Sequence, residues 1–360
     1  MHAHSHTIND GGRTLEAYVT TPEHGSGPGI LVVADAAGLD ATMRAFADLL
    51  AADGYTVLLA AIGEQSVAAA LASLRALPTC KGKLAAIGFG GGVTVALRAP
   101  VDCAIGYGSE ALGRSLELAA RTTMPIVLHG PADDAADGAP KNVAIYRYAD
   151  CDRAFYRPSA TVAAEPLRRG AVSMAYSRTL ALLRRELGPY YDLSALWEFH
   201  RACEFVTKDA AATMRTMVAQ PYVNHIPTMI GGYGQADLHR FYRDFFIPKL
   251  PSDIRNIPVS RTVGADRVVN EGVLCFTHDA EIAWMLPGVA PTGRYVEVAL
   301  VGIITFRGDK LVHEHIYWDQ ATVLVQIGLL DPRGLPVAGA DAARKVLDPS
   351  LPGNALLPGW

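Results

Sequence analysis

The chain has 360 residues, and 32 basic against 36 acidic side chains give it a net charge of −4. At roughly 150 residues per domain, this length predicts two domains, and a hydrophobic share of 50% is enough for each to bury a core. The weakly acidic balance offers no electrostatic attraction to a phosphate backbone, so we expect no nucleic-acid partner.

No apolar run approaches the ~18 residues that a membrane span needs, and the first residues lack the basic and apolar segments of a signal peptide. The cysteines are odd in number and scattered, which argues against a disulfide framework and a zinc knuckle. They are Cys80, Cys103, Cys151, Cys203 and Cys275. We therefore expect a cytoplasmic protein with reduced thiols and no membrane contact.

The first half alternates short apolar runs with helical patterns. Strands that are apolar throughout, each followed by a helix, predict a parallel sheet covered on both faces. The expected strands are residues 29–34, 55–61, 83–89, 124–128 and 142–146. The expected helices are residues 42–52, 67–77 and 168–187, and another begins at Val93.

Gly188-Pro189 ends the last of these helices and predicts a domain boundary, with a first domain over residues 1–188. The pattern then changes to helices followed by strands joined by turns, which predicts an α+β domain over residues 189–335. Its expected helices are residues 193–208, 210–218 and 238–246, and its expected strands are residues 268–277, 281–286, 295–306 and 311–318. Residues 336–360 are expected to form a surface tail.

The segment Gly88-Phe89-Gly90-Gly91-Gly92 lies between a predicted strand and a helix, where an α/β-hydrolase carries its nucleophile. Further matching stretches are residues 29–38, 46–57, 130–133 and 148–155. Together they resemble the dienelactone hydrolase family over about residues 8–187. The resemblance implies an α/β-hydrolase-like domain with a nucleophile, an acid and a histidine.

At these three positions the sequence has Gly90, Asp133 and Arg153. Glycine has no side chain to attack a substrate, and arginine stays protonated and cannot act as a base. Because such a catalytic unit loses nearly all activity when one member is missing, we expect a degenerate first domain without hydrolase activity.

Four segments of the second half have a recognisable order and spacing. They are residues 221–227 (Pro-Tyr-Val-Asn-His-Ile-Pro), 291–294 (Pro-Thr-Gly-Arg), 306–311 (Phe-Arg-Gly-Asp-Lys-Leu) and 318–328, which begins Trp-Asp. They resemble the SnoaL-like polyketide cyclases of the nuclear transport factor 2-like fold. The resemblance implies an α+β cone whose cavity binds small hydrophobic molecules, with Asp319 in the place of the group's acid/base.

Side chains of residues 311–319 alternate between two faces of the expected strand. His313, His315, Tyr317 and Asp319 share one face, which we expect to be the cavity wall. Burial raises the pKa of an aspartate towards values useful for proton transfer. The predicted catalytic residues are Asp319, His315 and His225, and the predicted substrate-contacting residues are Tyr317, Trp284 and Trp197.

A metal site on this strand is not expected, because six residues of strand separate His313 from Asp319 by about 20 Å. The sequence therefore predicts a cofactor-independent acid/base enzyme for a small hydrophobic oxygenated compound such as a lactone, an epoxide or a polyketide-like carbonyl. A homodimer is expected. Two alternatives stay open, namely an ester or lactone hydrolase of the dienelactone hydrolase type, and a non-catalytic protein that binds small molecules.

Overall fold

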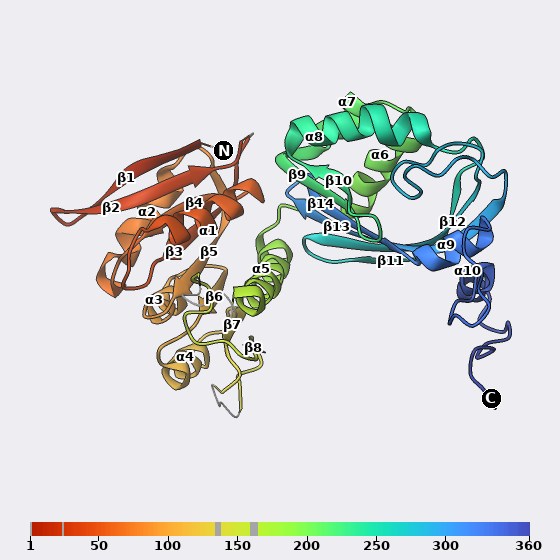
Figure 1. Ribbon diagram of the computed structural model, residues 1–360. Helices are drawn as coiled ribbons and strands as arrows, with labels where there is room; N and C mark the ends of the chain where they lie inside the picture. Colours follow the sequence, from red (N-terminus) through yellow and green to blue (C-terminus); the bar gives the residue numbers. More distant parts are fainter. Residues whose placement is uncertain (1, 24, 134–137, 159–164) are drawn as a thin grey trace. The chain divides into compact units, whose positions relative to one another are not determined.

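The computed structural model describes residues 2–23, 25–133, 138–158 and 165–360, and Figure 1 traces the chain. The chain forms two compact units, Met1–Tyr191 and Asp192–Trp360. The division falls a few residues after Gly188, where the sequence placed the boundary. Within the described ranges, no helix combines the length and the hydropathy needed to cross a membrane.

The first unit is built on an eight-stranded sheet in the order β1-β2-β4-β3-β5-β6-β7-β8. The strands are β1 (His2–Asp10), β2 (Arg13–Thr21), β3 (Gly27–Val33), β4 (Thr56–Ala60), β5 (Cys80–Phe89), β6 (Cys103–Tyr107), β7 (Ile126–Pro131) and β8 (Val143–Tyr148). Strand β1 pairs antiparallel with β2, and β2 pairs antiparallel with β4. The remaining pairings, from β4 through β3, β5, β6 and β7 to β8, are all parallel. This mixed sheet matches the hydrolase-like fold expected from the sequence.

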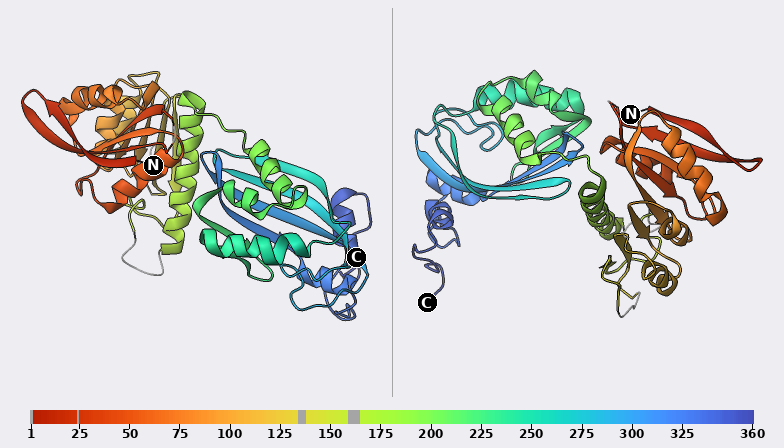
Figure 2. Two further views of the ribbon diagram at one scale, coloured as in Figure 1. Left: turned by 90° about the horizontal axis from the view of Figure 1, so that it is seen from above. Right: turned by 180° about the vertical axis from the view of Figure 1, so that it is seen from behind.

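Helices cover both faces of this sheet. They are α1 (Ala41–Ala52), α2 (Val67–Ala76), α3 (Gly92–Arg98), α4 (Leu112–Ala119) and α5 (Glu165–Leu187), with a short turn η1 (Glu64–Ser66). On one face, Leu31 and Val33 of β3 pack with α2 and α3. On the other, Phe46 of α1 contacts Phe89 and also Tyr176 of α5, the long helix that Figure 2 shows along the sheet.

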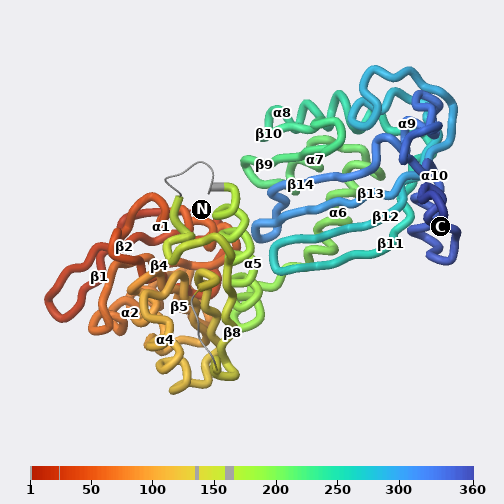
Figure 3. Tube along the Cα trace, turned by 60° about the horizontal axis from the view of Figure 1, so that its bottom comes forward, coloured from red at the N-terminus to blue at the C-terminus, as the bar shows by residue number. Residues whose placement is uncertain are grey.

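The second unit contains a six-stranded sheet in the order β10-β9-β14-β13-β12-β11 (Figure 3). The strands are β9 (Met217–His225), β10 (Ile230–Tyr233), β11 (Arg255–Val263), β12 (Arg267–Thr277), β13 (Tyr295–Arg307) and β14 (Lys310–Trp318). Only the pairing of β14 with β9 is parallel in the described part of this sheet.

Three helices lie over one face of this sheet (Figure 1), and this arrangement fits a cone-like domain. They are α6 (Leu193–Phe205), α7 (Ala210–Arg215) and α8 (Gly234–Arg240), which continues through a π-helical turn, η2 (Phe241–Phe246), and a 3-10 turn, η3 (Ile247–Lys249). Two further helices, α9 (Gln320–Gln326) and α10 (Ala340–Leu347), follow the last strand.

Two predicted elements of this unit are wrong. Residues 281–286 form turns rather than a strand, because the amides of Met285 and Leu286 donate to the carbonyl of Ile282 at 3.1 and 2.7 Å instead of to a neighbouring strand. The helix expected to run to residue 218 ends at Arg215, and β9 begins at Met217. The expected tail contains α10, whose Ala343 packs on Val273 of β12.

Candidate active site

A cavity of about 150 Å³ lies in the second unit between α6, the π-helical turn and the sheet. A cavity of this volume holds one benzene-sized ring. Its apolar wall includes Trp197, Phe205, Tyr242, Phe246, Leu274, Trp284, Leu300 and Ile316. Its polar side chains are Arg201, Glu204, His225, Arg255, Asn256, Asn270 and Glu314. An apolar pocket with a few convergent polar groups is the usual form of a small-molecule site.

Helix α6 supplies one wall of the cavity. Asp192 caps the helix by accepting a hydrogen bond from the amide of Ala195 at 2.9 Å, which fixes where the helix begins. From there Trp197, Arg201 and Glu204 follow at i, i+4 and i+7, the spacing that brings side chains to one face. All three line the cavity.

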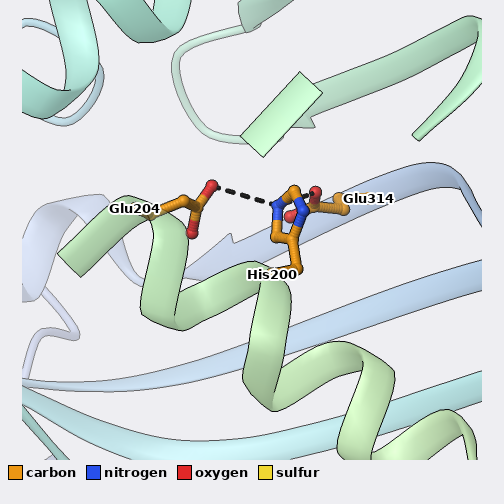
Figure 4. Close-up of side chains that lie close together, drawn as sticks. All are labelled: His200, Glu204 and Glu314. Atoms are coloured by element: carbon orange, nitrogen blue, oxygen red, sulfur yellow. Dashed lines mark ion pairs between the residues drawn. The ribbon is translucent and has the colours of Figure 1, made fainter. Parts of the chain in front are cut away.

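A buried cluster of one imidazole and two carboxyl groups joins this helix to β14 (Figure 4). Nε2 of His200 lies 3.2 Å from Oε1 of Glu204, one helical turn away, and 3.1 Å from Oε1 of Glu314. The three side chains are at most 6% exposed. Both carboxyl groups line the cavity, whereas His200 stands behind them.

The hydrogen bonds of Thr216 determine the protons on His200. The Thr216 hydroxyl donates to the carbonyl of Thr213 at 2.6 Å, so towards His200 it can only accept. Nδ1 of His200, 2.6 Å from that hydroxyl, is therefore the donor and carries a proton. A second proton on Nε2 makes an imidazolium that faces both carboxylates.

Electrostatics favour that charged form. Burial alone would lower the pKa of His200, but the carboxylates of Glu204 and Glu314 raise it to about 10. Burial also raises the pKa of Glu204 above its usual value, against the opposing effect of His200. The ligand atoms of the cluster lie within 4.8 Å of one another, and a metal ion bound there would have to displace the proton on Nε2 of His200.

Tyr242 completes the polar part of the cavity. Its hydroxyl donates to Oε1 of Glu314 at 3.5 Å, and burial next to two carboxyl groups raises its pKa well above the usual value. The phenol therefore stays protonated at neutral pH. Tyr242 is presented by the π-helical turn, an irregularity often found at functional sites.

His225 lies at the end of β9 and is neutral. Its Nδ1 donates to the carbonyl of Ile230 at 2.9 Å, and burial lowers its pKa to about 4. Its ring packs against Trp284, with centroids 4.8 Å apart. His225, Trp284 and Trp197 all line the cavity, where the sequence placed them. Nε2 of His225 is left as a hydrogen-bond acceptor.

The predicted site residues Asp319, Tyr317 and His315 lie outside the cavity. The prediction that their side of β14 faces the cavity is therefore wrong. Asp319 is exposed and caps α9, accepting from the amide of Ala321 at 3.0 Å and from the hydroxyl of Thr322 at 2.6 Å. Tyr317 is 40% exposed, and neither it nor the half-buried His315 lines the cavity. The face that points inward carries Glu314, Ile316 and Trp318.

The three residues of the cluster were therefore missed from the sequence, and so was Tyr242. A usable signal was present in β14, where Glu314 alternates with the apolar Ile316 and Trp318 and so shares the buried face. A second signal was the helical spacing of Trp197, His200 and Glu204.

In the first unit, Gly90 lies between β5 and α3 with a φ of +52°, in the left-handed region. A Cβ atom there would lie 3.3 Å from Cβ of Asp35 and 3.4 Å from both Oε1 of Glu110 and the Tyr156 hydroxyl. Arg157 pairs with Asp35, and Tyr156 donates to it at 2.9 Å. Although burial would raise the pKa of Asp35, these donors lower it. The surroundings of Gly90 are therefore acidic and already hydrogen-bonded.

The other two positions of the expected triad, Asp133 and Arg153, are both exposed. His129, at the end of β7, is a core residue whose pKa burial lowers to about 3. Its Nδ1 lies 2.9 Å from the hydroxyl of Tyr148 and its Nε2 lies 3.1 Å from that of Thr179. These contacts bury the ring within the unit.

Comparisons with known proteins find similarity to two kinds of protein. The sequence profile of the Dienelactone hydrolase family matches residues 15–68. A comparison with curated proteins gives no match. Among solved structures, a dienelactone hydrolase-like promiscuous phosphotriesterase from metagenomic libraries is 21% identical, with 52% of this chain and 99% of that chain covered and a TM-score of 0.45.

Two further solved structures resemble the C-terminal part. An NTF2-like protein of unknown function from Burkholderia pseudomallei is 18% identical, with 38% of this chain and 96% of that chain covered and a TM-score of 0.29. TsrD from Streptomyces laurentii is 15% identical over the same shares, with a TM-score of 0.31. The chain is thus similar to dienelactone hydrolases in its first part and to NTF2-like proteins in its second.

Proposed function

We propose that the second unit is an acid/base enzyme that moves a proton on a small hydrophobic oxygenated compound, such as a lactone, an epoxide or a carbonyl compound. The observation that carries this proposal is the pair Glu204 and Glu314, which lines an apolar cavity and shares the buried imidazole of His200. The chemistry requires only protons and no organic cofactor. The proposed catalytic residues are thus Glu204 and Glu314, in place of Asp319, which is an exposed helix cap.

The two carboxyl groups suit complementary roles. Burial raises the pKa of Glu204, so it is the member of the pair that we assign to take up a proton and donate it to a substrate oxygen. Glu314, beside the His200 imidazolium, is the carboxylate that can accept a proton from carbon. For a ketone, the α-proton goes to Glu314, the proton of Glu204 goes to the carbonyl oxygen, and an enol forms. Return of a proton from Glu314 to carbon, while the enol O–H proton goes back to Glu204, restores the carbonyl and completes an exchange or an isomerisation.

The test follows deuterium uptake by cyclohexanone in D2O by NMR, together with ring opening of δ-valerolactone and styrene oxide. We expect the unmodified protein to accelerate at least one of these reactions and Glu204→Gln and Glu314→Gln to lose about 10²-fold or more. The matched control is Glu281→Gln in the same unit, where the side chain is 45% exposed, and it should retain full activity. No acceleration with any of the three probes would refute the proposal.

We also propose that the first unit is degenerate, meaning that it has lost hydrolase activity. Gly90 provides no nucleophile, and Asp133 and Arg153 are solvent-exposed. Treatment of the full chain with a fluorophosphonate probe should label no serine in residues 1–191. A labelled serine, located by mass spectrometry, would instead support the ester or lactone hydrolase.

A homodimer through the outer face of the second sheet is proposed as the assembly. This face carries Tyr317, 40% exposed, and His315, whose ring contacts Tyr222 with centroids 5.6 Å apart. Sedimentation equilibrium should give a dimer mass, and Tyr317→Asp should give a monomer, because a charge in an apolar contact is costly to bury. A monomer mass for the unmodified chain would contradict the assembly.

A further inference from the structure

The polar groups of the cavity separate by burial into a floor and a mouth. Glu204 and Glu314 are 4% and 3% exposed and lie with Tyr242 at the floor. Arg201 and Asn256 are half-buried and Arg255 is exposed, so these three form the mouth. The floor is acidic and the mouth is cationic. A ligand that spans the cavity therefore meets opposite charges at its two ends.

We infer that the substrate is a single-ring compound with a carboxylate, which Arg201, Arg255 and Asn256 hold at the mouth while its reacting oxygen meets the floor. This inference rests on the proposed function for the role of the floor, and it adds the chemical class of the substrate. The next three observations support it.

Both guanidinium groups keep donors for a ligand. Arg201 makes one ion pair, from Nη1 to Glu198 at 3.3 Å, on the exposed side of the helix. Arg255 donates from Nη2 to the hydroxyl of Tyr295 at 3.0 Å. A guanidinium has five N–H donors, and its planar fork matches a carboxylate. Neither arginine pairs with Glu204 or Glu314 among the ion pairs of the described residues.

The position of Asn256 depends on a glycine. A Cβ atom on residue 272 of β12 would lie 2.5 Å from Oδ1 and 2.8 Å from Nδ2 of Asn256, so only glycine leaves room for this amide. The backbone of Gly272 does not have a positive φ, so its conformation does not require glycine. The reason for glycine at this position is the space that it leaves for the Asn256 side chain. Within the described part of the chain, the Asn256 amide makes no side-chain hydrogen bond, and it lines the cavity.

The size of the ligand follows from the helix and the cavity. Arg201 and Glu204 are three residues apart on α6, a rise of about 4.5 Å, and both line the cavity. The cavity volume of about 150 Å³ likewise fits one ring. A fused two-ring compound should therefore bind more weakly.

Direct binding tests this inference without turnover. The chain has four tryptophans, at positions 197, 284, 318 and 360, all in the second unit, and two of them line the cavity. We would titrate the full chain at pH 7.5 and low salt with benzoate, with benzamide as the neutral compound of the same shape, and with 1-naphthoate. Benzoate should bind at least about fivefold more tightly than benzamide, and 1-naphthoate should bind more weakly than benzoate.

The double variant Arg201→Gln/Arg255→Gln should bind benzoate and benzamide equally, and Asn256→Ala should weaken benzoate binding. The matched control is Arg333→Gln, an arginine of the same unit that is 90% exposed, and it should keep the preference. Added salt should reduce the preference, because the mouth is open to solvent. Equal affinities in the unmodified chain, a preference that survives the double variant, or no binding of either compound would overturn the inference.

The outcome is separable from that of the proposed function. Benzoate selectivity without any proton transfer would leave this inference standing and refute the acid/base proposal. Proton transfer on neutral compounds, without benzoate selectivity, would support the acid/base proposal and refute this inference.

Discussion

Thr216 accepts a hydrogen bond from Nδ1 of His200 at 2.6 Å, and this contact directs the other ring nitrogen towards both carboxyl groups. Replacement Thr216→Val keeps the shape of the side chain but leaves the Nδ1–H without an acceptor in a site where His200 is 0% exposed. We expect the second unit to lose about 1–3 kcal/mol of unfolding free energy. Urea unfolding followed by tryptophan fluorescence measures this loss.

Thr207→Val is the control for that change, because Thr207 is exposed and its hydroxyl makes only long contacts of 3.4 Å with helix carbonyls. It should change the stability by less than about 0.5 kcal/mol. Equal losses for the two variants would show that the Thr216–His200 bond does not hold the imidazole in place.

The stability of the second unit should fall as the pH rises from 6.5 to 10. The folded-state pKa of His200 is raised to about 10, above its ordinary 6.5, so its stabilisation is complete below pH 6.5 and is lost as the pH approaches 10.

Fluorescence-detected unfolding at pH 6.5, 8 and 10 measures this slope. In His200→Gln the slope should be largely lost, while His239→Gln on α8 should retain it. A flat profile for the unmodified chain would mean that His200 is neutral in the folded state.

Strands β3 and β4 could be predicted from sequence because they are apolar on both faces, so the runs around Leu31 and Leu58 needed no choice of face. The buried strand β6 was missed. In β14 the alternation of side chains defined two faces but not which one is buried, and the histidine-rich face was assigned to the cavity. The structure buries Glu314 and Ile316 instead, and the register of β14 shifts between Leu311 and His313. Its pairing partner β9 was also unforeseen.

The cluster itself could not be assembled from sequence. His200 and Glu204 are far from Glu314 along the chain, and only the packing of α6 over the sheet brings the three together. Strands β1 and β2 were missed for a different reason. The segment from His2 to Asp10 is polar and mostly exposed, so it lacks the apolar alternation that indicates a strand.

Gly302 should control how much room the cavity offers. It lines the floor on β13, and a Cβ atom there would lie 3.2 Å from Cδ1 of Ile304 and 3.4 Å from Cδ1 of Ile316, the mobile ends of two side chains. Gly302→Ala should therefore fold, and it should weaken benzoate binding by about threefold to tenfold by occupying ligand space. Fluorescence titration measures the change.

The control is Gly113→Ala in α4 of the first unit, where a Cβ atom meets nothing within 4 Å. That variant should gain up to about 1 kcal/mol from helix propensity and bind benzoate as the unmodified chain does. Unchanged binding in Gly302→Ala would place the ligand away from the floor.

Gly90→Cys should not restore hydrolase activity to the first unit. The new side chain would lie beside Asp35 and Glu110, whose negative charge disfavours a thiolate, and the φ of +52° adds a strain of about 1 kcal/mol. We expect p-nitrophenyl acetate hydrolysis to stay at the level of the unmodified chain, and iodoacetamide to react slowly at the new thiol. Cys151, half-buried in the same unit, is the internal reference for labelling. Rapid esterase activity would show that the site lacks only its nucleophile.

Substitution of Asp319 separates helix capping from catalysis. The carboxylate accepts from the Ala321 amide and the Thr322 hydroxyl at the start of α9, and it is exposed to solvent. Asp319→Asn keeps an oxygen that can cap, so it should retain both stability and proton transfer, whereas Asp319→Ala should cost about 1 kcal/mol of stability. Urea unfolding and deuterium exchange on the same samples distinguish the two roles. If Asp319→Asn folds normally but loses proton transfer while Glu204→Gln retains it, the reacting group is Asp319, and the assignment to the buried pair fails.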